Sequence, residues 1–231
     1  MGLRTFLKEK RLEERSLVYR IVTFLYRLFG CNNVNVCKGN FINVEGCLMK
    51  NSHIDIEGTG NQVYLKWGGS IDDLRITIKG SNNKIVIGRF SSLKKADLYI
   101  EDDNNLISFG ENTNICGFTH VAAIEGCSIE FGDACLFSTN VIFRVGDSHS
   151  ILSAETRKRI NPSRSIKIGN RVWFGNNTTI LKGVKIKDDT IVGTGSIVTK
   201  SSNKSNVILA GSPAKIVKEN IQWDSRRLPI E

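Results

Sequence analysis

The sequence predicts an all-β solenoid, in which short strands wind around one core and successive coils stack on each other. Two observations carry this prediction. From Ile168 onward an apolar residue recurs every six positions. Upstream, Asn-rich turns start at residues 60, 81 and 103. The 231-residue chain also has 21 Gly and only 3 Pro, which suits many short strands joined by tight turns.

The regular repeat has a leading apolar position and a small position four residues later. Six residues fit one short strand and one turn, with one large and one small side chain pointing inward. Three such units close a triangular coil, and stacking pairs the backbone of each coil with the next. The leading positions are Ile168, Phe174, Ile180, Ile186, Val192 and Val198, and the small positions are Val172, Thr178, Val184, Thr190 and Ser196.

The repeat continues upstream in a less regular form. Phe131, Phe137 and Phe143 are spaced by six. Further back, "GNQVYL" (60–65), "SNNKIVIG" (81–88) and "DNNLISFG" (103–110) each place an Asn-rich turn before alternating apolar residues. Their spacing exceeds three sixes, so we expect wider coils of the same solenoid. Asn suits left-handed turns and can stack in ladders.

Residues 11–30, "RLEERSLVYRIVTFLYRLFG", have the character of a helix. The apolar block 17–29 is interrupted only by Arg20, Thr23 and Arg27, which lie near one helix face. The block is too short to span a bilayer. Two alternatives remain open. The helix covers the open end of the β domain or contacts a partner subunit, which we favour, or it lies in a membrane interface.

Charge and cysteine content restrict the function. The net charge is +9, and residues 150–231 carry fifteen Lys/Arg against six Asp/Glu. This basic third is suited to an anionic partner. No nucleic-acid-binding signature is present, so we expect no nucleic acid partner. The six cysteines contain no Cys-x-x-Cys pair, and three histidines are too few and scattered for a zinc site. We therefore expect no metal, and reduced, mostly buried thiols in a cytoplasmic protein. The charged N-terminus does not read as a cleavable signal peptide.

The segment 166–215, with its repeat, the "VWFG" turn, "ILKGV", "GTGSIVT" and the closing "AGSPAK", resembles the hexapeptide-repeat acyltransferases. The resemblance covers about the last eighty residues, from "DSHSI" (147–151) onward, and implies a left-handed parallel β-helix. Within that family the combination of "DSHSI" and "VWFG" resembles sugar and polysaccharide O-acetyltransferases. The resemblance implies transfer of acetyl from acetyl-CoA to a sugar hydroxyl of a surface polysaccharide or its precursor. It also implies a homotrimer with active sites between neighbouring prisms.

By this resemblance His149 is the general base, because it stands 24 residues before Trp173 as the catalytic His and Trp do in the family. Imidazole titrates near neutral pH, so it can take the proton of an attacking hydroxyl. His120, at an outward position of a coil, and His53 are the weaker candidates.

Asp147 either orients the imidazole, because residues i and i+2 of a strand share a face, or forms the turn after Gly146. Trp173, outward by the repeat frame, either walls the thioester end of the acetyl-CoA site or packs in a subunit contact.

The same resemblance supplies cofactor and acceptor residues. Glycine-rich turns allow close approach of the pantetheine arm, and cations meet the nucleotide phosphates. The cofactor candidates are Arg164, Gly175, Gly193, Thr194, Gly195, Lys200, Gly211, Ser212 and Lys215. For an acidic acceptor, Arg157 and Arg159 of the basic loop are the candidates, since guanidinium groups suit carboxylates. The expected organisation is an N-terminal helical segment (1–30), divergent coils (31–130), the hexapeptide-repeat acetyltransferase β-helix (131–215) with a protruding loop (150–165), and a cap (216–231) in which Trp223 packs on the last coil.

Two other functions compete with this interpretation. The same fold supports N-acetylation of an amino-sugar nucleotide. A solenoid that has lost activity and only binds or scaffolds is the third alternative, and retention of the His and the Trp turn argues against it.

Overall fold

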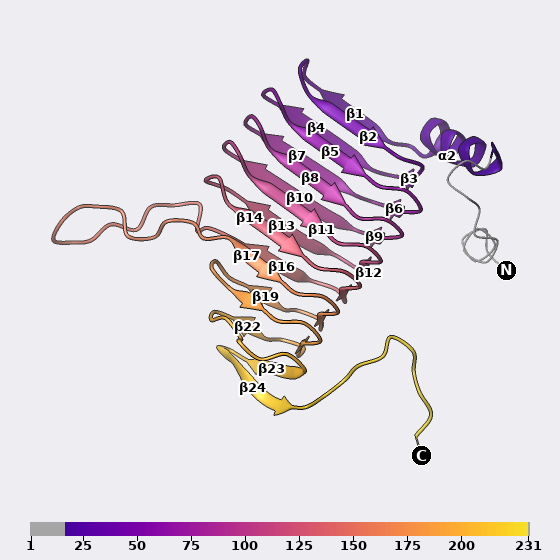
Figure 1. Cartoon of the computed structure of the whole chain (residues 1–231). Helices are drawn as coiled ribbons and strands as arrows, with labels where there is room; N and C mark the ends of the chain where they lie inside the picture. Colours follow the sequence, from indigo (N-terminus) through magenta and orange to yellow (C-terminus); the bar gives the residue numbers. More distant parts are fainter. Residues whose placement is uncertain (1–16, 231) are drawn as a thin grey trace.

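The computed structural model describes residues 17–230 and shows three parallel sheets wrapped around one core (Figure 1). Sheet A holds β1 (Asn33–Val36), β4 (His53–Glu57), β7 (Arg75–Lys79), β10 (Ala96–Glu101), β13 (Thr119–Ala123), β16 (Val141–Arg144), β19 (Thr179–Ile180) and β22 (Ile197–Val198). Sheet B holds β2 (Phe41–Val44), β5 (Gln62–Leu65), β8 (Lys84–Ile87), β11 (Leu106–Phe109), β14 (Ser128–Phe131), β17 (Ile166–Ile168) and β20 (Lys185–Ile186). Sheet C holds β3 (Leu48–Lys50), β6 (Ser70–Asp72), β9 (Ser92–Lys94), β12 (Asn114–Ile115), β15 (Leu136–Phe137), β18 (Trp173–Phe174), β21 (Ile191–Val192), β23 (Val207–Gly211) and β24 (Ala214–Glu219).

The chain visits the sheets in the order A, B, C, so each coil is a triangle with three corners. Corners stack into three edges of the prism, which we name A/B, B/C and C/A after the sheets they join. The fold is the left-handed parallel β-helix that the sequence predicted, with one N-terminal helix in the described residues. The antiparallel pair of β23 and β24 ends the stack.

Coil length changes along the prism. His53 pairs with Arg75, 22 residues on, whereas Ile168 pairs with Ile186, 18 residues on. Eighteen residues are three hexapeptides, and the longer coils carry longer strands, as the ragged upstream spacing predicted.

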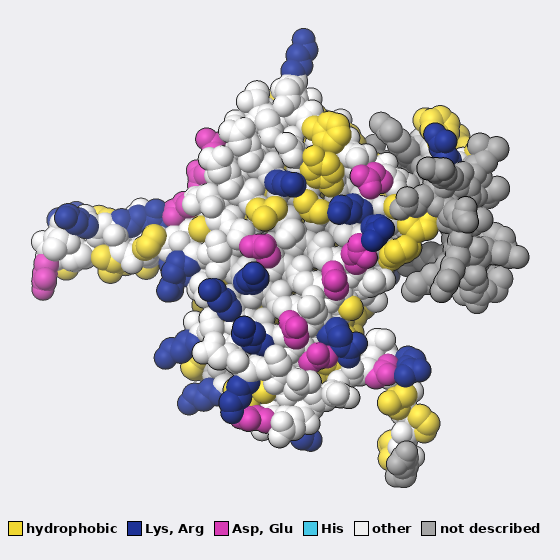
Figure 2. All heavy atoms as spheres, in the orientation of Figure 1, with side chains coloured by type: hydrophobic (Ala, Val, Ile, Leu, Met, Phe, Trp, Pro, Cys, Tyr) yellow, Lys and Arg dark blue, Asp and Glu magenta, His cyan; other side chains and the backbone are white. Residues whose placement is uncertain are grey.

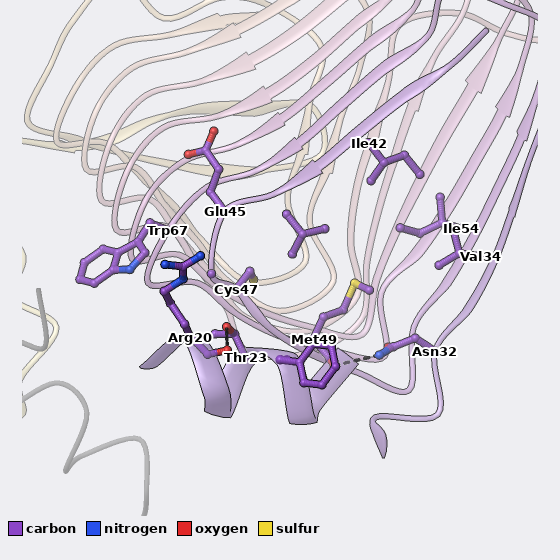
Figure 3. Close-up of a pocket in the computed structure, with 13 residues that line it drawn as sticks. Arg20, Thr23, Asn32, Val34, Ile42, Glu45, Cys47, Met49, Ile54 and Trp67 are labelled. Carbon is purple, nitrogen blue, oxygen red and sulfur yellow. Dashed lines mark hydrogen bonds between the residues drawn. The ribbon is translucent and has the colours of Figure 1, made fainter. Parts of the chain in front are cut away.

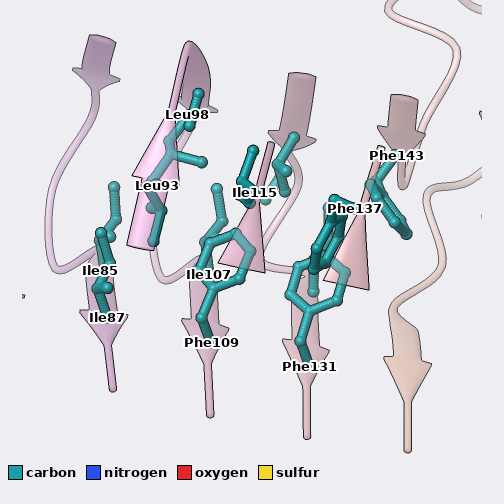
Figure 4. Packing of buried hydrophobic residues seen from close by; sticks show 14 of the residues in the cluster. Ile85, Ile87, Leu93, Leu98, Ile107, Phe109, Ile115, Phe131, Phe137 and Phe143 are labelled. Atoms are coloured by element: carbon teal, nitrogen blue, oxygen red, sulfur yellow. The ribbon is translucent and has the colours of Figure 1, made fainter. Parts of the chain in front are cut away.

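The core consists of the inward positions of the repeat. Every predicted leading and small position from Ile168 to Val198 is buried, at 2% exposure or less. Aromatic rings fill the middle of the prism, where Phe109 stacks on Phe131 at 4.6 Å (Figure 4). Phe137 lies 5.0 Å from Phe174. This continuous column of rings joins the wide coils to the narrow ones.

Asparagines line the A/B edge as a ladder, in which Asn61, Asn83 and Asn105 are buried and Asn40 is half-buried. The side-chain oxygen of Asn40 accepts from the backbone N–H of Asn61, that of Asn61 from Asn83, and that of Asn83 from Asn105, at 2.8–2.9 Å. The ladder ends where Asn105 accepts from the N–H of Cys127 at 3.0 Å. Each of these corners is therefore tied to the next through an asparagine amide.

The cysteines only partly follow the prediction. All six are free, but only Cys47 and Cys135 are buried, Cys127 is half-buried, and Cys31, Cys37 and Cys116 are exposed. The expectation of mostly buried thiols is thus wrong, because the exposed cysteines fall at outward or corner positions of the coils. Burial raises the pKa of Cys47 and Cys135 to about 12, which keeps both as inert thiols.

The N-terminal helix α2 (Leu17–Phe29) lies against β3 at the open end of the prism. A cavity of about 900 Å³ is lined by α2 and the first coils, and Arg20 points across it on the side of Glu45 and Trp67 (Figure 3). Residues 1–16 of the predicted helical segment lie outside the described residues. No described helix has the length and hydropathy needed to cross a bilayer.

The ladder predicts a large cost for removing one buried amide. Asn83→Ala should lower the free energy of unfolding by about 3 kcal/mol, because it leaves the buried N–H of Asn105 and the carbonyl of Asp102 without partners. The exposed Asn114→Ala should change it by less than about 0.5 kcal/mol. Urea unfolding followed by circular dichroism measures both. Equal stability of the two variants would contradict the role of the ladder.

Candidate functional site

A long loop, residues 145–165, interrupts the prism between β16 and β17 and projects from the A/B edge (Figure 1). Its two arms pair through an antiparallel bridge between Leu152 and Arg159. Apolar side chains of the loop are exposed, with Ile151 at 54% and Ile160 at 59%. Lys and Arg side chains lie along it and over the C-terminal coils (Figure 2). The loop thus has a mixed apolar and basic surface.

Neighbouring coils of the prism clamp the base of the loop. Arg159 forms a 2.6 Å ion pair with Glu125 of the preceding coil, and Glu125 also accepts from the backbone N–H of Ser163 at 3.0 Å. These two hydrogen bonds hold the pKa of the Glu125 carboxyl below its usual range, and the one from Arg159 has the larger effect. On the other side, Gly183 of the following coil donates its N–H to the carbonyl of Arg164 at 3.0 Å. The loop is therefore docked on the coils above and below.

Of the two alternatives for Asp147, the structure has the irregular turn after Gly146 and not the strand face. Residues 145–150 belong to no strand, and Ser148 has a φ of 62°, so Asp147 and His149 do not share a strand face. In the described chain the Asp147 carboxylate instead pairs with Lys182 and accepts from the Asn161 amide at 2.8 Å. These contacts lower the pKa of Asp147, and the one with Lys182 has the largest effect. The Asp147 carboxylate thus joins the loop residue Asn161 to Lys182 of the following coil, and it does not contact the imidazole of His149.

The three histidines have different surroundings. His149 is exposed near the base of the loop. His120 points outward from β13, as expected, where its Nδ1 lies 2.8 Å from the Oδ2 of Asp97 on the neighbouring strand. His53 is half-buried on β4. Of the three, only His149 stands on an irregular segment that leaves the prism.

Trp173 points outward from β18 and is partly covered by the C-terminal tail. Its Nε1 lies 3.5 Å from the Ser138 hydroxyl, and its ring lies 6.0 Å from that of Trp223. Trp223 donates its Nε1–H to the carbonyl of Arg171 at 2.7 Å, and Arg171 donates back to the carbonyl of Trp223 at 2.8 Å. The expectation that Trp223 packs on the last coil is therefore wrong. The tail runs back along the prism, because the ring of Trp223 packs near that of Trp173 and two hydrogen bonds join Trp223 to Arg171.

The C/A edge gathers the glycine-rich turns. Gly175 donates its N–H to the carbonyl of Val192 at 2.8 Å, and a Cβ there would come within 2.7 Å of the N of Thr194, so its lack of a side chain serves the stacking of coils. Gly195, at φ 72°, faces open space. The candidates along this edge are Gly175, Gly193, Thr194, Gly195, Gly211 and Ser212, next to Trp173.

The cationic candidates do not join this edge as one group. Arg164 and Lys200 lie at the A/B edge, since Arg164 contacts Gly183 and Lys200 follows β22. Lys215 lies exposed on β24. Arg157 occupies the turn of the loop with a φ of 56°, and Arg159 is engaged by Glu125. Within one chain the predicted residues thus form two sets, with His149 on the A/B edge and Trp173 beside the C/A edge.

Sequence reasoning missed the residues that anchor the loop, namely Asn161, Lys182 and Glu125. Asn161 is 6% exposed although it lies in a loop, and its amide contacts Asp147, His149, Ile151 and Arg159. No periodic pattern marks such contacts, because they join irregular backbone to two different coils. No cluster of three or more His, Cys, Asp or Glu side chains suited to a metal occurs among the described residues.

Comparison with known proteins agrees with this architecture. Residues 165–200 match the family described as bacterial transferase hexapeptide (six repeats). The solved polysialic acid O-acetyltransferase OatWY is 30% identical, with a TM-score of 0.79, and the match covers 85% of this chain and 92% of that one. The polysialic-acid-specific acetyltransferase NeuO is also 30% identical, with a TM-score of 0.73, over 84% of this chain and 82% of that one.

A curated relative, the polysialic acid O-acetyltransferase of Escherichia coli O1:K1 / APEC, is 36% identical over 118 residues. That match spans 51% of this chain but only 38% of the relative, so this chain covers well under two thirds of that protein's length. Taken with the fold and the repeat, these similarities identify a class of protein. The chain belongs to the hexapeptide-repeat acyltransferases with a left-handed β-helix.

Proposed function

We propose that the protein is an acetyl-CoA-dependent O-acetyltransferase that acts on a sugar hydroxyl of a surface polysaccharide, capsule or lipopolysaccharide, or of its precursor. The observation that carries the proposal is an exposed His149 on a clamped loop, on a prism that superposes on OatWY over 85% of its length. OatWY and NeuO, with TM-scores of 0.79 and 0.73, are both named as polysialic acid acetyltransferases. An acidic polysaccharide is therefore the first acceptor to test.

In the proposed reaction His149 acts as general base in a direct transfer. Its neutral imidazole takes the proton of the sugar hydroxyl as that oxygen attacks the thioester carbonyl of acetyl-CoA. The tetrahedral adduct collapses, the C–S bond breaks, and the leaving thiolate of CoA takes the proton from the imidazolium. A backbone N–H at a coil turn is suited to stabilise the oxyanion. This scheme needs no covalent enzyme intermediate.

The donor site is proposed along the C/A edge. Trp173 walls its thioester end, and the pantetheine arm runs past Gly175, Gly193, Thr194 and Gly195 toward the turn at Gly211 and Ser212. The open space at Gly195 supports this path, because a backbone without a Cβ lets a ligand approach closely. Arg164 and Lys200 on the A/B edge and Lys215 on β24 remain proposed phosphate contacts, which a second chain would bring together with the C/A edge.

The acceptor is proposed to meet the basic loop. Arg157 at the turn is exposed and suited to a carboxylate of an acidic glycan. Arg159 retains that proposed role only in part, since its guanidinium already binds Glu125 and Asn161. Asp147 is proposed to assist catalysis by fixing the loop through Lys182.

A homotrimer is proposed because the two sets of residues lie on different edges of one prism. A complete site then combines the loop of one chain with the C/A edge of its neighbour, and closed rings of identical chains form such sites by symmetry. The exposed Ile151, Leu152 and Ile160 of the loop are suited to that contact.

A cytoplasmic location against the inner face of the membrane is proposed from α2. Ile21, Phe24, Leu25 and Leu28 recur at spacings of three and four and are 43–58% exposed, so they form one apolar stripe. Residues 1–30 carry seven Lys/Arg and three Asp/Glu, which complements anionic lipid. The occupant of the stripe is thus proposed to be an anionic bilayer surface.

The enzymatic proposal is tested by release of free thiol from acetyl-CoA with a panel of acidic glycans, neutral glycans and amino-sugar nucleotides. Turnover with glycans should fall at least about a thousandfold in His149→Ala, because the base is lost. The matched control, His53→Ala, should keep wild-type turnover. Full activity of His149→Ala together with loss in His120→Ala would move the base to His120. Turnover with amino sugars alone would replace O-acetylation by N-acetylation, and no turnover at all would leave a binding solenoid.

The membrane proposal is tested by co-sedimentation with vesicles of phosphatidylglycerol and phosphatidylcholine or of phosphatidylcholine alone. The wild-type protein should sediment with the anionic vesicles, less so at high salt, because basic residues meet the lipid headgroups. Phe24→Glu with Leu28→Glu should remove binding, whereas Ile230→Glu, on the 99% exposed tail residue, should not. Equal sedimentation of both variants would refute the proposal. The proposal would also be refuted if the wild type did not bind vesicles and the Phe24→Glu, Leu28→Glu variant had a different oligomeric mass, because the stripe would then be a subunit contact.

A further inference from the structure

Asn161 saturates its side-chain hydrogen bonds at the base of the loop. Its Oδ1 accepts from the N–H of Ile151 at 2.7 Å and from the Nε of Arg159 at 3.2 Å. Its Nδ2 donates to the Oδ2 of Asp147 and to the backbone carbonyl of His149, both at 2.8 Å. These four contacts use the full capacity of a primary amide. An amide so engaged and 6% exposed fixes each group that it touches.

The contacts of Asn161 hold the segment on both sides of His149, through the Asp147 side chain before it and through the backbone of His149 and Ile151. One amide grips Asp147, two residues before the histidine, the carbonyl of His149 itself, and the N–H of Ile151, two residues after it. The returning arm of the loop adds the hydrogen bond from the N–H of Ile160 to the carbonyl of Ile151 at 2.8 Å. The freedom left to the imidazole is therefore mainly that of its own side-chain torsions.

The asparagine is in turn fixed to the prism. Lys182, in the turn between β19 and β20, pairs with Asp147 and lies 3.4 Å from the carbonyl of Asn161. Arg159 donates to the same carbonyl at 3.2 Å and binds Glu125 of the preceding coil. The segment around His149 is thus anchored to the preceding and following coils through the buried amide of Asn161, although it lies on an exposed loop.

We propose that Asn161 is a positioning residue for His149, which sets where the imidazole meets the acceptor hydroxyl. This inference rests on the proposed function, in which His149 is the base. A general base works only within hydrogen-bond reach of the proton it removes, and small displacements cost large factors in rate. Asn161 touches no reacting atom in this scheme and acts through the backbone of His149.

The first experiment separates positioning from binding. Asn161→Ala should lower kcat at least about tenfold while KM for acetyl-CoA stays within about twofold, because the donor edge is untouched. Asn161→Asp should behave similarly, since it keeps the acceptor oxygen but loses the donor and faces Asp147 with a like charge. Asn43→Ala, on β2 and far from the loop, is the control and should keep wild-type kinetics. A kcat within about twofold of wild type in Asn161→Ala would overturn the inference.

A double-mutant comparison asks whether Asn161 acts through His149. Adding Asn161→Ala to His149→Ala should cause less than about a twofold further loss, because groups acting as one unit are not additive. A further tenfold loss in the double variant would assign Asn161 a structural role instead. If Asn161→Ala fails to fold by circular dichroism, Lys182→Met tests the same clamp from the coil side and should give the same kinetics.

A spectroscopic readout does not depend on activity. The chain has only three histidines, so their ring Cε1–H signals are resolvable by nuclear magnetic resonance and assignable with His149→Ala. In Asn161→Ala the His149 signal should shift or broaden while those of His53 and His120 stay in place. An unchanged His149 signal would overturn the inference even if the protein were inactive on every sugar. An altered signal together with full activity of His149→Ala would instead reject only the proposed base.

Discussion

Parallel stacking of the coils is the constraint on which the rest of the structure depends. Each strand pairs with the strand one coil earlier and one coil later, so equivalent residues must form columns along the prism. Inward columns become the core, as with the rings of Phe109, Phe131, Phe137 and Phe174. Corner columns must satisfy buried backbone groups, which the Asn ladder does at the A/B edge. Outward columns carry side chains that the stacking of coils does not constrain, such as Trp173 and His120.

The loop is the one large departure from this order among the described residues, and the prism holds it in place. It leaves the edge just below the point where the Asn ladder ends at Cys127. Polar contacts replace the ladder there: Glu125 with Arg159 from the coil above, and Lys182 with Asp147 from the coil below. The proposed base His149 on an exposed segment needs such support, because loops are otherwise the mobile parts of a protein. The regular coils thus fix the base of the loop, and Asn161 is proposed to fix the position of His149 relative to them.

The six-residue period was sufficient to predict the inward face of the C-terminal coils, because coil geometry ties sequence position directly to burial. It also predicted the outward direction of Trp173 and of His120. Periodicity does not decide between alternatives where the backbone is irregular: Asp147 was expected either on a strand face or in the turn after Gly146, and it lies in irregular backbone beside the left-handed Ser148, paired with Lys182. Trp223 was expected on the last coil, yet pairing with Arg171 draws the tail back to Trp173. Contacts between a loop, a tail and distant coils leave no spacing in the sequence that reveals them.

The central claim is that one catalytic site combines the A/B edge of one chain with the C/A edge of another. Subunit mixing tests it most directly. His149→Ala and Trp173→Ala chains, each expected to be inactive alone, are refolded together in equal amounts. In a ring where each site takes the histidine from one chain and the tryptophan from its neighbour, random assembly restores about one quarter of wild-type activity. Activity that stays at the level of the separate variants would contradict the account, because each chain would then need both residues itself.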